Sequence, residues 1–414
     1  MRKALIVFVL LALLVSNVAD AVTSEMFKPK AQIWHRFEAS NRDFNSRTAY
    51  NNFNILRSRL SVTITPTDDI EAFIQVQDSR IWGEEFSTLT DGSADNFDLH
   101  QGYVKIKKFF KAPLDIKLGR QSVNYGEQRL VGAVEWHRIG RSFNGAIFDL
   151  HGEKWWVDGF AFQVVDSLYT GDYQDLFFWG GYANYKLHQN HRAQVFAMWQ
   201  RKQPPSVLNR GTVGWFLEGD IGAFSYASDA AYQFGDITPA REQDNPVSTV
   251  EAWMFTLKLG FAPADVKTKP EIYLAADVLS GDGDPDDNKW KVFDTLYATN
   301  HKFYGFMDYF LNIPLHTFGG GLIDTWGRFK VTPLERTPMM LDIHYFQSQQ
   351  DVLLSDDTKS NKFGTEVDFT LMHNYTTNLT FILGASWFGP EGVFKDKRGL
   401  DDSTWFYVWT VFNV

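Results

Sequence analysis

The feature that most constrains this chain is an alternation of apolar and polar residues with a period of two, which recurs along its 414 residues. This is the period of a β-strand whose two faces meet different surroundings. Within residues 57–64, Leu60 and Val62 share one face. Arg57 and Arg59 share the other face. The same alternation recurs in residues 71–77, 100–107, 114–118, 146–151, 193–200, 253–259, 271–278, 341–345, 363–371 and 381–387.

The alternating segments predict an all-β protein. No stretch after Ala21 holds about 18 consecutive apolar residues, so the sequence offers no transmembrane helix. In lipid only helices and closed barrels satisfy every backbone polar group. A soluble β-sandwich also alternates, but its domains are compact, near about 100 residues. We count roughly 18 candidate strands with no break in composition, which favours a transmembrane antiparallel up-and-down β-barrel over residues 22–414.

The first 21 residues have the pattern of a secretory signal peptide. Arg2 and Lys3 precede an apolar run over residues 4–15, and residues 19–21 form an A-x-A cleavage site. The chain has no cysteine, so it offers neither a lipoprotein anchor nor a disulfide. Aromatic residues make up 16% of the sequence, which suits the aromatic girdles of a membrane barrel. These features predict export to the bacterial outer membrane.

The connections between the candidate strands differ in length. Residues 65–69 and 188–191 are short polar turns, whereas residues 82–97, 281–303 and 390–403 are long and rich in Gly, Asp and Asn. Short turns at one rim and long loops at the other are the layout of outer-membrane barrels.

In such a barrel the apolar face meets lipid and the polar face lines the lumen. Rings of Arg and Lys in a lumen favour anions, and 16–18 strands leave room for an aqueous channel. The alternative is that these charges pair across the lumen as a structural ladder and select nothing. Besides Arg57 and Arg59, the polar face presents Glu71, Lys105, Lys107, Lys117, Asp149, Lys258, Asp277, Glu366 and Asp368.

The most informative stretch is residues 114–152, in which two amphipathic strands flank an arginine-rich, glycine-punctuated segment. Arg120 has the parity of Leu118, which would direct it toward lipid. A β-bulge at Gly119 would turn Arg120 into the lumen instead, and we expect this arrangement.

Motifs for metals or catalysis are weak. Residues 282–288 begin like a calcium loop, but Asp287 stands where the loop needs Gly and Phe293 where it needs Glu. His188 and His191 lack further ligands for zinc. No G-x-S-x-G, H-E-x-x-H or phosphate-loop motif occurs. We therefore expect no enzymatic activity, no metal and no cofactor.

Two pieces carry a family resemblance. LGRQSVNYGEQRLVGAVEW at residues 118–136 and GRSFNGAIF at residues 140–148 resemble the signature of the alginate export family of outer-membrane β-barrels. The similarity continues at residues 57–60, 77–83, 230–235, 279–287, 293–297 and 301–308. The resemblance implies an 18-stranded barrel whose arginine-rich constriction passes an anionic uronate polymer. The arginines that it implies along the path are Arg57, Arg59, Arg80, Arg120, Arg129 and Arg141.

Together these observations predict a monomeric outer-membrane channel that passes an anionic solute or an alginate-like polysaccharide by passive diffusion. Its expected partners are outer-membrane lipid, the anionic cargo and a periplasmic export machinery, with no nucleic acid. A general porin for small solutes and a structural or adhesion barrel remain open. The residues predicted to line the pore are Arg57, Arg59, Arg80, Lys117, Arg120, Arg129, Arg141, Asp149, Glu366 and Asp368.

Overall fold

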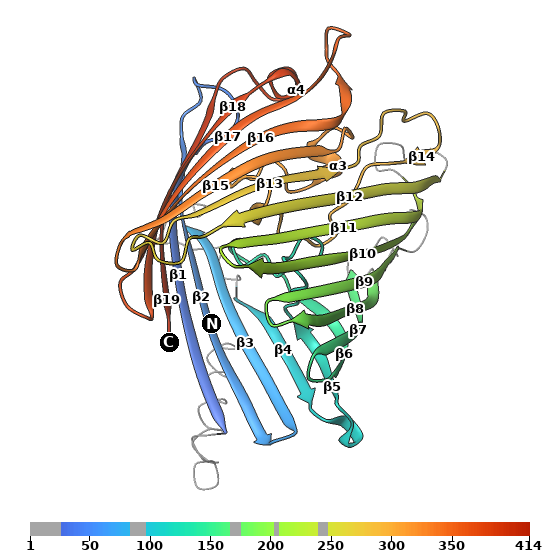
Figure 1. Ribbon diagram of the computed structural model, residues 1–414, viewed down its shortest axis with the longest axis vertical. Helices are drawn as coiled ribbons and strands as arrows, with labels where there is room; N and C mark the ends of the chain where they lie inside the picture. Colours follow the sequence, from blue (N-terminus) through green and yellow to red (C-terminus); the bar gives the residue numbers. More distant parts are fainter. Residues whose placement is uncertain (1–25, 83–96, 166–174, 203–206, 239–246) are drawn as a thin grey trace.

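The protein is an all-β barrel. The computed structural model describes residues 26–82, 97–165, 175–202, 207–238 and 247–414, so the predicted signal peptide lies outside the described residues. Within them the strands form one 19-stranded sheet, in which the first strand pairs with both the second and the last (Figure 1). Eighteen antiparallel strands close the wall, and the short β14 lies parallel to β12. The predicted fold class is confirmed.

Each wall strand is hydrogen-bonded to its sequence neighbours, and β13 pairs with β15. The wall strands are β1 (Phe27–Asn41), β2 (Asn51–Thr67), β3 (Ile70–Trp82), β4 (Phe97–Ile106), β5 (Leu114–Gln121), β6 (Phe143–His151), β7 (Trp155–Val165), β8 (Leu176–His188), β9 (His191–Lys202), β10 (Leu208–Ile221), β11 (Phe224–Ile237), β12 (Ser248–Phe261), β13 (Glu271–Leu279), β15 (Leu322–Leu334), β16 (Thr337–Leu353), β17 (Lys359–Asn374), β18 (Leu379–Pro390) and β19 (Ser403–Asn413).

The remaining elements are short. No helix among the described residues is long and apolar enough to cross a membrane. These elements are η1 (Phe109–Lys111), β14 (Lys289–Trp290), η2 (Asn300–Lys302), α3 (Ile313–His316) and α4 (Gly392–Lys397).

The alternation in the sequence becomes the two faces of the wall. On β12, Trp253 and Leu259 are exposed on the outer face, whereas Met254 is buried on the inner face. On β2, Leu60 is 47% exposed and Arg57 only 2% exposed. Since the outer face of a membrane barrel meets lipid, its exposed apolar side chains are the expected pattern.

The two rims of the barrel differ. At one rim, strands are joined by tight turns such as residues 68–69, 189–190 and 222–223. At the other rim lie the long connections, of which residues 122–142 and 280–321 are the longest that the structure describes throughout.

Two segments from the long connections fold into the lumen. We call residues 122–142 the first inner segment and residues 291–321 the second inner segment. They meet as a short parallel bridge, in which the Gly132 amide donates to the Tyr297 carbonyl at 2.9 Å and the Tyr297 amide donates to the Leu130 carbonyl at 2.8 Å. The sequence pattern predicts a long loop over residues 281–303, whereas the structure has residues 291–303 of this range inside the lumen.

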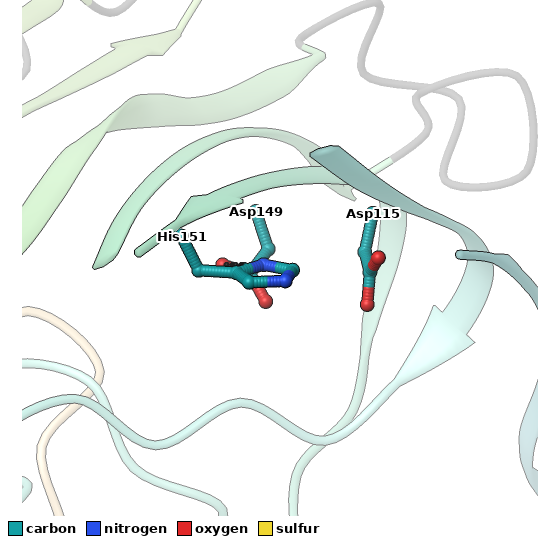
Figure 2. A group of neighbouring side chains, drawn as sticks. All are labelled: Asp115, Asp149 and His151. Carbon is teal, nitrogen blue, oxygen red and sulfur yellow. Dashed lines mark ion pairs between the residues drawn. The ribbon is translucent and has the colours of Figure 1, made fainter. Parts of the chain in front are cut away.

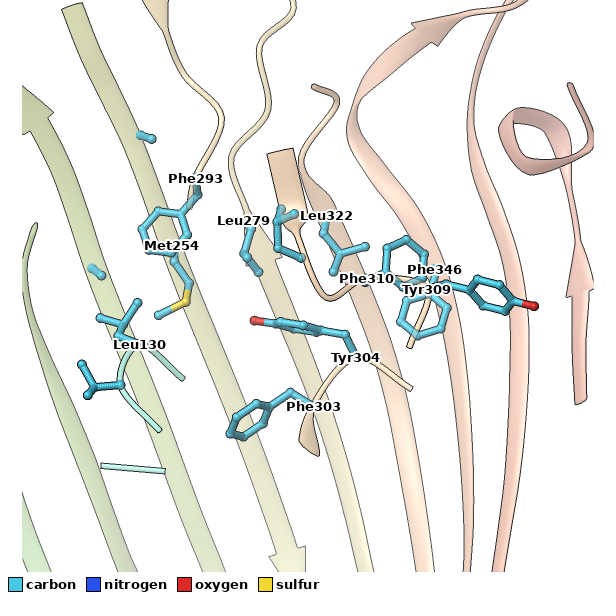
Figure 3. Packing of buried hydrophobic residues seen from close by; sticks show 14 of the residues in the cluster. Leu130, Met254, Leu279, Phe293, Phe303, Tyr304, Tyr309, Phe310, Leu322 and Phe346 are labelled. Atoms are coloured by element: carbon cyan, nitrogen blue, oxygen red, sulfur yellow. The ribbon is translucent and has the colours of Figure 1, made fainter. Parts of the chain in front are cut away.

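The second inner segment folds inward because it is apolar. In Figure 3 its Phe303 and Phe310 lie beside buried side chains such as Met254, Leu279 and Phe346, which come from β12, β13 and β16. Burying apolar area contributes about 25 cal/mol per Å². A large part of the lumen is therefore a packed hydrophobic core.

Candidate functional site: the charged lumen

The inner face of β1 and β2 carries buried arginines. Arg36, Arg57 and Arg59 are at most 5% exposed, and we call these three residues the arginine wall. Arg36 donates to Glu38 at 2.7 Å and to the Trp136 carbonyl at 3.1 Å. Inward placement of Arg57 and Arg59 follows from their alternation with outward residues on β2.

The arginine wall holds the first inner segment by its carbonyl oxygens. Arg57 donates to the carbonyls of Glu135 at 3.2 Å and His137 at 3.1 Å. Arg59 donates to the Ile139 carbonyl at 3.1 Å. Both guanidinium groups also reach the Glu135 carboxylate, Arg59 at 2.6 Å and Arg57 at 3.3 Å. One carboxylate is thus shared by two arginines, and it balances only one of their two positive charges.

The opposite part of the wall, from β11 to β17, is acidic. Its carboxylates lie on the inner face and are at most 6% exposed. We call this set the acidic wall: Asp229, Asp277, Asp324, Asp342, Glu366 and Asp368.

The acidic wall holds the second inner segment by its amide groups. The Met307 amide donates to Glu366 at 2.8 Å, and the Phe306 amide donates to Asp368 at 3.3 Å. Gly305 makes this close approach possible. Its φ is +78°, and a Cβ there would lie 2.5 Å from the Glu366 carboxylate. Glu366 and Asp368 do face inward, as predicted, but beneath this segment.

Arg129 of the first inner segment crosses the lumen to the acidic wall. Its guanidinium lies 2.9 Å from Asp277, 3.4 Å from Asp229 and 4.1 Å from the centre of the Phe303 ring. Burial alone would lower the pKa of Arg129, but Asp277, Tyr304 and Asp229 outweigh burial and raise that pKa above its ordinary value. Arg129 is therefore a structural cation.

Arg141 joins the two inner segments. Its guanidinium donates to the carbonyls of Gly132 and Ala298, each at 3.2 Å, and to the carbonyl of Tyr297. It has no carboxylate partner among the residues that the structure describes. Burial lowers the pKa of Arg141. Within the described residues its positive charge is offset by backbone carbonyls and by the ring of Tyr297, whose centre lies 5.8 Å from the guanidinium carbon.

Lys117 and Asp149 lie on the inner face of β5 and β6, as predicted. The Lys117 ammonium lies 4.0 Å from the centre of the Tyr103 ring. Asp149 pairs in register with Asp115 across β5 and β6. Both residues lie near the rim with tight turns, away from the inner segments.

Arg80 and Arg120 lie on the outer face, so they do not line the lumen. The register of β5 with β4 and β6 runs through Gly119 without a shift, so the expected bulge is absent. Arg120 keeps the parity of Leu118 and donates to the Leu99 carbonyl at 2.9 Å. Arg80 has the opposite parity to the buried Ser79, and its guanidinium pairs with Asp78 at 2.7 Å.

In the part of the chain that the structure describes, one group of side chains has metal-ligand geometry. Asp115, Asp149 and His151 each offer a ligand atom, and these atoms lie within 4.8 Å of one another (Figure 2). The Asp115 carboxylate, however, already binds the Lys105 ammonium at 2.8 Å and accepts from the Lys108 amide at 3.0 Å. Lys105 pairs with Asp115, and His151 lies 3.5 Å from Asp149, so each carboxylate of the cluster already has a side-chain partner.

Sequence reasoning missed Arg36, Glu135 and the whole second inner segment. Arg36 carries a readable signal, because it has the parity of the buried Trp34 on β1. The second inner segment also has one, since Phe303, Phe306 and Phe310 are too apolar for a loop in water. Nothing local to Glu135 marks it as the partner of two arginines.

The comparisons with known proteins agree with this architecture. The model of the alginate export family matches residues 28–318. The chain belongs to the alginate export family. It is thus an outer-membrane barrel of the channel type. No curated protein matches its sequence.

Solved outer-membrane channels share the fold of this chain. OccK11 (OpdR) of Pseudomonas aeruginosa matches with a TM-score of 0.61 and 10% identity over 94% of this chain and 96% of that one. OccAB4 of Acinetobacter baumannii matches with a TM-score of 0.62 and 9% identity over 94% and 98%. OpdK of P. aeruginosa, solved with vanillate, matches with a TM-score of 0.59 and 11% identity over 94% and 98%.

Proposed function

We propose that this protein is a passive channel for anionic solutes that carry carboxylates. A surplus of guanidinium groups supports the proposal. Arg129 of the first inner segment pairs with the acidic wall. The other described arginines of β1, β2, their connection and the first inner segment form ion pairs with only two carboxylates, Glu38 and Glu135. These other arginines are Arg36, Arg42, Arg47, Arg57, Arg59, Arg138 and Arg141.

Fixed cations at a constriction replace part of the hydration that a carboxylate loses on entering the lumen. The family name points to a uronate as the carboxylate, alone or in a polymer. A polymer would have to displace the contact between Val131 and Tyr297, which joins the inner segments. We therefore put small anions first and a polyuronate second. OpdK, the fold relative solved with vanillate, gives a precedent for a small carboxylate.

The proposal includes no chemical step. The protein acts as a monomer in the outer membrane, where solutes move down their gradients. If the cargo is a polyuronate, a periplasmic export machinery delivers it to the rim with tight turns.

The test is ion selectivity of the purified full chain in a planar bilayer under a potassium chloride gradient. The reversal potential should indicate preference for chloride. Arg138→Gln should lower that preference, because it removes one positive charge without breaking an ion pair among the described residues. Equal permeability of both ions, unchanged in the variant, would leave a general porin. Absence of current would leave a structural barrel. Glucuronate and a short oligouronate, each replacing chloride, separate small-anion passage from polymer passage.

A further inference from the structure

A cavity of about 320 Å³ lies between the two inner segments and the inner face of β15 to β19. It is distinct from the 550 Å³ cavity that lies near the tight turns from β8 to β13. Its lining includes Trp136 of the first inner segment and Lys302 and Phe306 of the second. From the wall it is lined by Arg328, Met340, Thr370, Met372, Ile382, Tyr407 and Trp409.

The wall of this cavity is apolar, which is unusual for the lumen of a channel. Met372 pairs in register with Ile382, and Ile382 pairs with Trp409, so their side chains lie side by side across β17, β18 and β19. Met340 continues this patch on β16. These four residues form what we call the thioether–indole patch. Trp136 of the first inner segment packs edge-on against Trp409, with ring centres 5.1 Å apart, and the four residues of the patch line the cavity.

Two cations and one carboxylate, Glu135, line the cavity beside the patch, and the Glu135 carboxylate is paired with Arg57 and Arg59. Lys302 is exposed and donates to the Glu127 carbonyl at 3.0 Å, and it pairs with no carboxylate in the described ranges. Arg328 gives its Nε to Asp342 at 2.5 Å, and a guanidinium has further donors at its two terminal nitrogens. The indole Nε1 of Trp409 is buried and has no hydrogen-bond partner in the described structure.

This arrangement selects a class of ligand. Indole and thioether groups pack favourably against aromatic rings, and an adjacent ammonium binds a carboxylate by a charge-assisted hydrogen bond. The patch itself supplies one N–H group without a partner among the described residues, so its surface suits a flat apolar ring better than the hydroxyl groups of a sugar. Other polar groups of the lining lie outside the patch, on Gln128, Glu135, Thr299, His301, Thr370 and Tyr407. A ring with one carboxylate also fits the volume, which is at the lower end of about 300–1,000 Å³ for small-ligand pockets.

We propose that this cavity binds small aromatic carboxylates, with the ring on the thioether–indole patch and the carboxylate at Lys302. The inference rests on the proposed function, because an anion must first enter the lumen. It adds a binding step to passage and names the solute class as aromatic.

The experiment is calorimetric titration of the full chain in detergent with benzoate, benzyl alcohol and glucuronate. Benzoate carries both the ring and the charge, whereas each of the others lacks one of them. Benzoate should bind saturably and at least about tenfold more tightly than either, because losing a charged hydrogen bond or a buried ring costs more than about 1.4 kcal/mol. Glucuronate binding as tightly as benzoate, or no saturable benzoate binding, would overturn the inference.

Variants test the assigned residues. Lys302→Gln should weaken benzoate by about tenfold and leave benzyl alcohol unchanged. The matched control is Lys289→Gln, since Lys289 is exposed and pairs with Glu251 far from the cavity. Equal benzoate affinity in Lys302→Gln and the wild type would contradict the assignment. Chloride selectivity of the same preparation separates the two proposals: intact selectivity without benzoate binding overturns only the cavity, and lost selectivity overturns the anion channel.

Discussion

The arginine wall and the acidic wall use opposite charges for the same task. The arginines of β1 and β2 donate to carbonyl oxygens of the first inner segment, as Arg57 does to His137 at 3.1 Å. The carboxylates of β17 accept from amides of the second inner segment, as Glu366 does from Met307 at 2.8 Å. The inner segments have little regular secondary structure, so their buried backbone N–H and C=O groups need hydrogen-bond partners from the wall. The charged side chains of the two walls therefore anchor the inner segments, and only the charge that is left over can select a solute.

The two walls differ in what remains after the anchoring. The side chains of both walls are buried, at most 5% exposed for the arginine wall and at most 6% for the acidic wall, so the difference lies in their partners. On the arginine side, the Glu135 side chain that Arg57 and Arg59 share is 51% exposed. A change of charge at Glu135 should therefore alter the electrostatic potential along the ion path. A change of charge beneath the second inner segment should alter that potential much less. The following predictions test this difference.

The largest effect is expected from Arg129→Met, which removes the cation that joins the first inner segment to the acidic wall. Asp277 and Asp229 would keep buried charges without a counter-ion, which costs about 3–5 kcal/mol. The first inner segment should leave its place, seen as higher single-channel conductance and protease cleavage within residues 122–142. The double variant Arg129→Met/Asp277→Leu should recover part of the loss. Unchanged conductance and cleavage would refute a tethering role for Arg129.

The next effect is expected from Glu135→Gln, which frees two guanidinium charges on the arginine wall. Anion preference should rise, because uncompensated arginines in a lumen favour anions. The first inner segment should stay in place, since Arg57 and Arg59 still donate to its carbonyls. The reversal potential under a salt gradient measures the change. Glu335→Gln is the control, because the Glu335 side chain is 91% exposed in a turn. A shift of equal size in that control would disprove the local effect.

Much of the barrel could be predicted from the sequence because strand alternation is a local signal. The parity of Leu60 against Arg57 and Arg59 places the two arginines in the lumen without any knowledge of partners. Parity also directs Arg120 outward. The family resemblance suggested otherwise, and the continuous register at Gly119 shows that parity decides.

The site was less predictable because it is made by contacts between distant residues. Glu135 meets Arg57 and Arg59 only after the first inner segment has folded back across the lumen. Tyr297 meets Val131 from the other side of the barrel. An irregular segment has no periodicity to read, so its place follows from partners that only the structure reveals.

A smaller effect is expected from Ser79→Ala. The Ser79 hydroxyl donates to the Arg138 carbonyl at 2.9 Å, which is one of several bonds between the wall and the first inner segment. Losing a single neutral hydrogen bond costs about 1 kcal/mol. Hydrogen exchange of the amides near Arg138 should quicken, while conductance stays as in the wild type. Ser58→Ala on the neighbouring strand has the opposite parity and should leave that exchange unchanged.

The smallest effect on selectivity is expected from Glu366→Gln, which changes the same charge as Glu135→Gln but on the acidic wall. The amide oxygen of glutamine still accepts from Met307, so the second inner segment stays anchored. Glu366 is fully buried, so the lost charge is far from permeating ions. The reversal potential should match the wild type, although Glu135→Gln shifts it. A shift as large as that of Glu135→Gln would mean that both walls border the ion path and that the second inner segment leaves the acidic wall open.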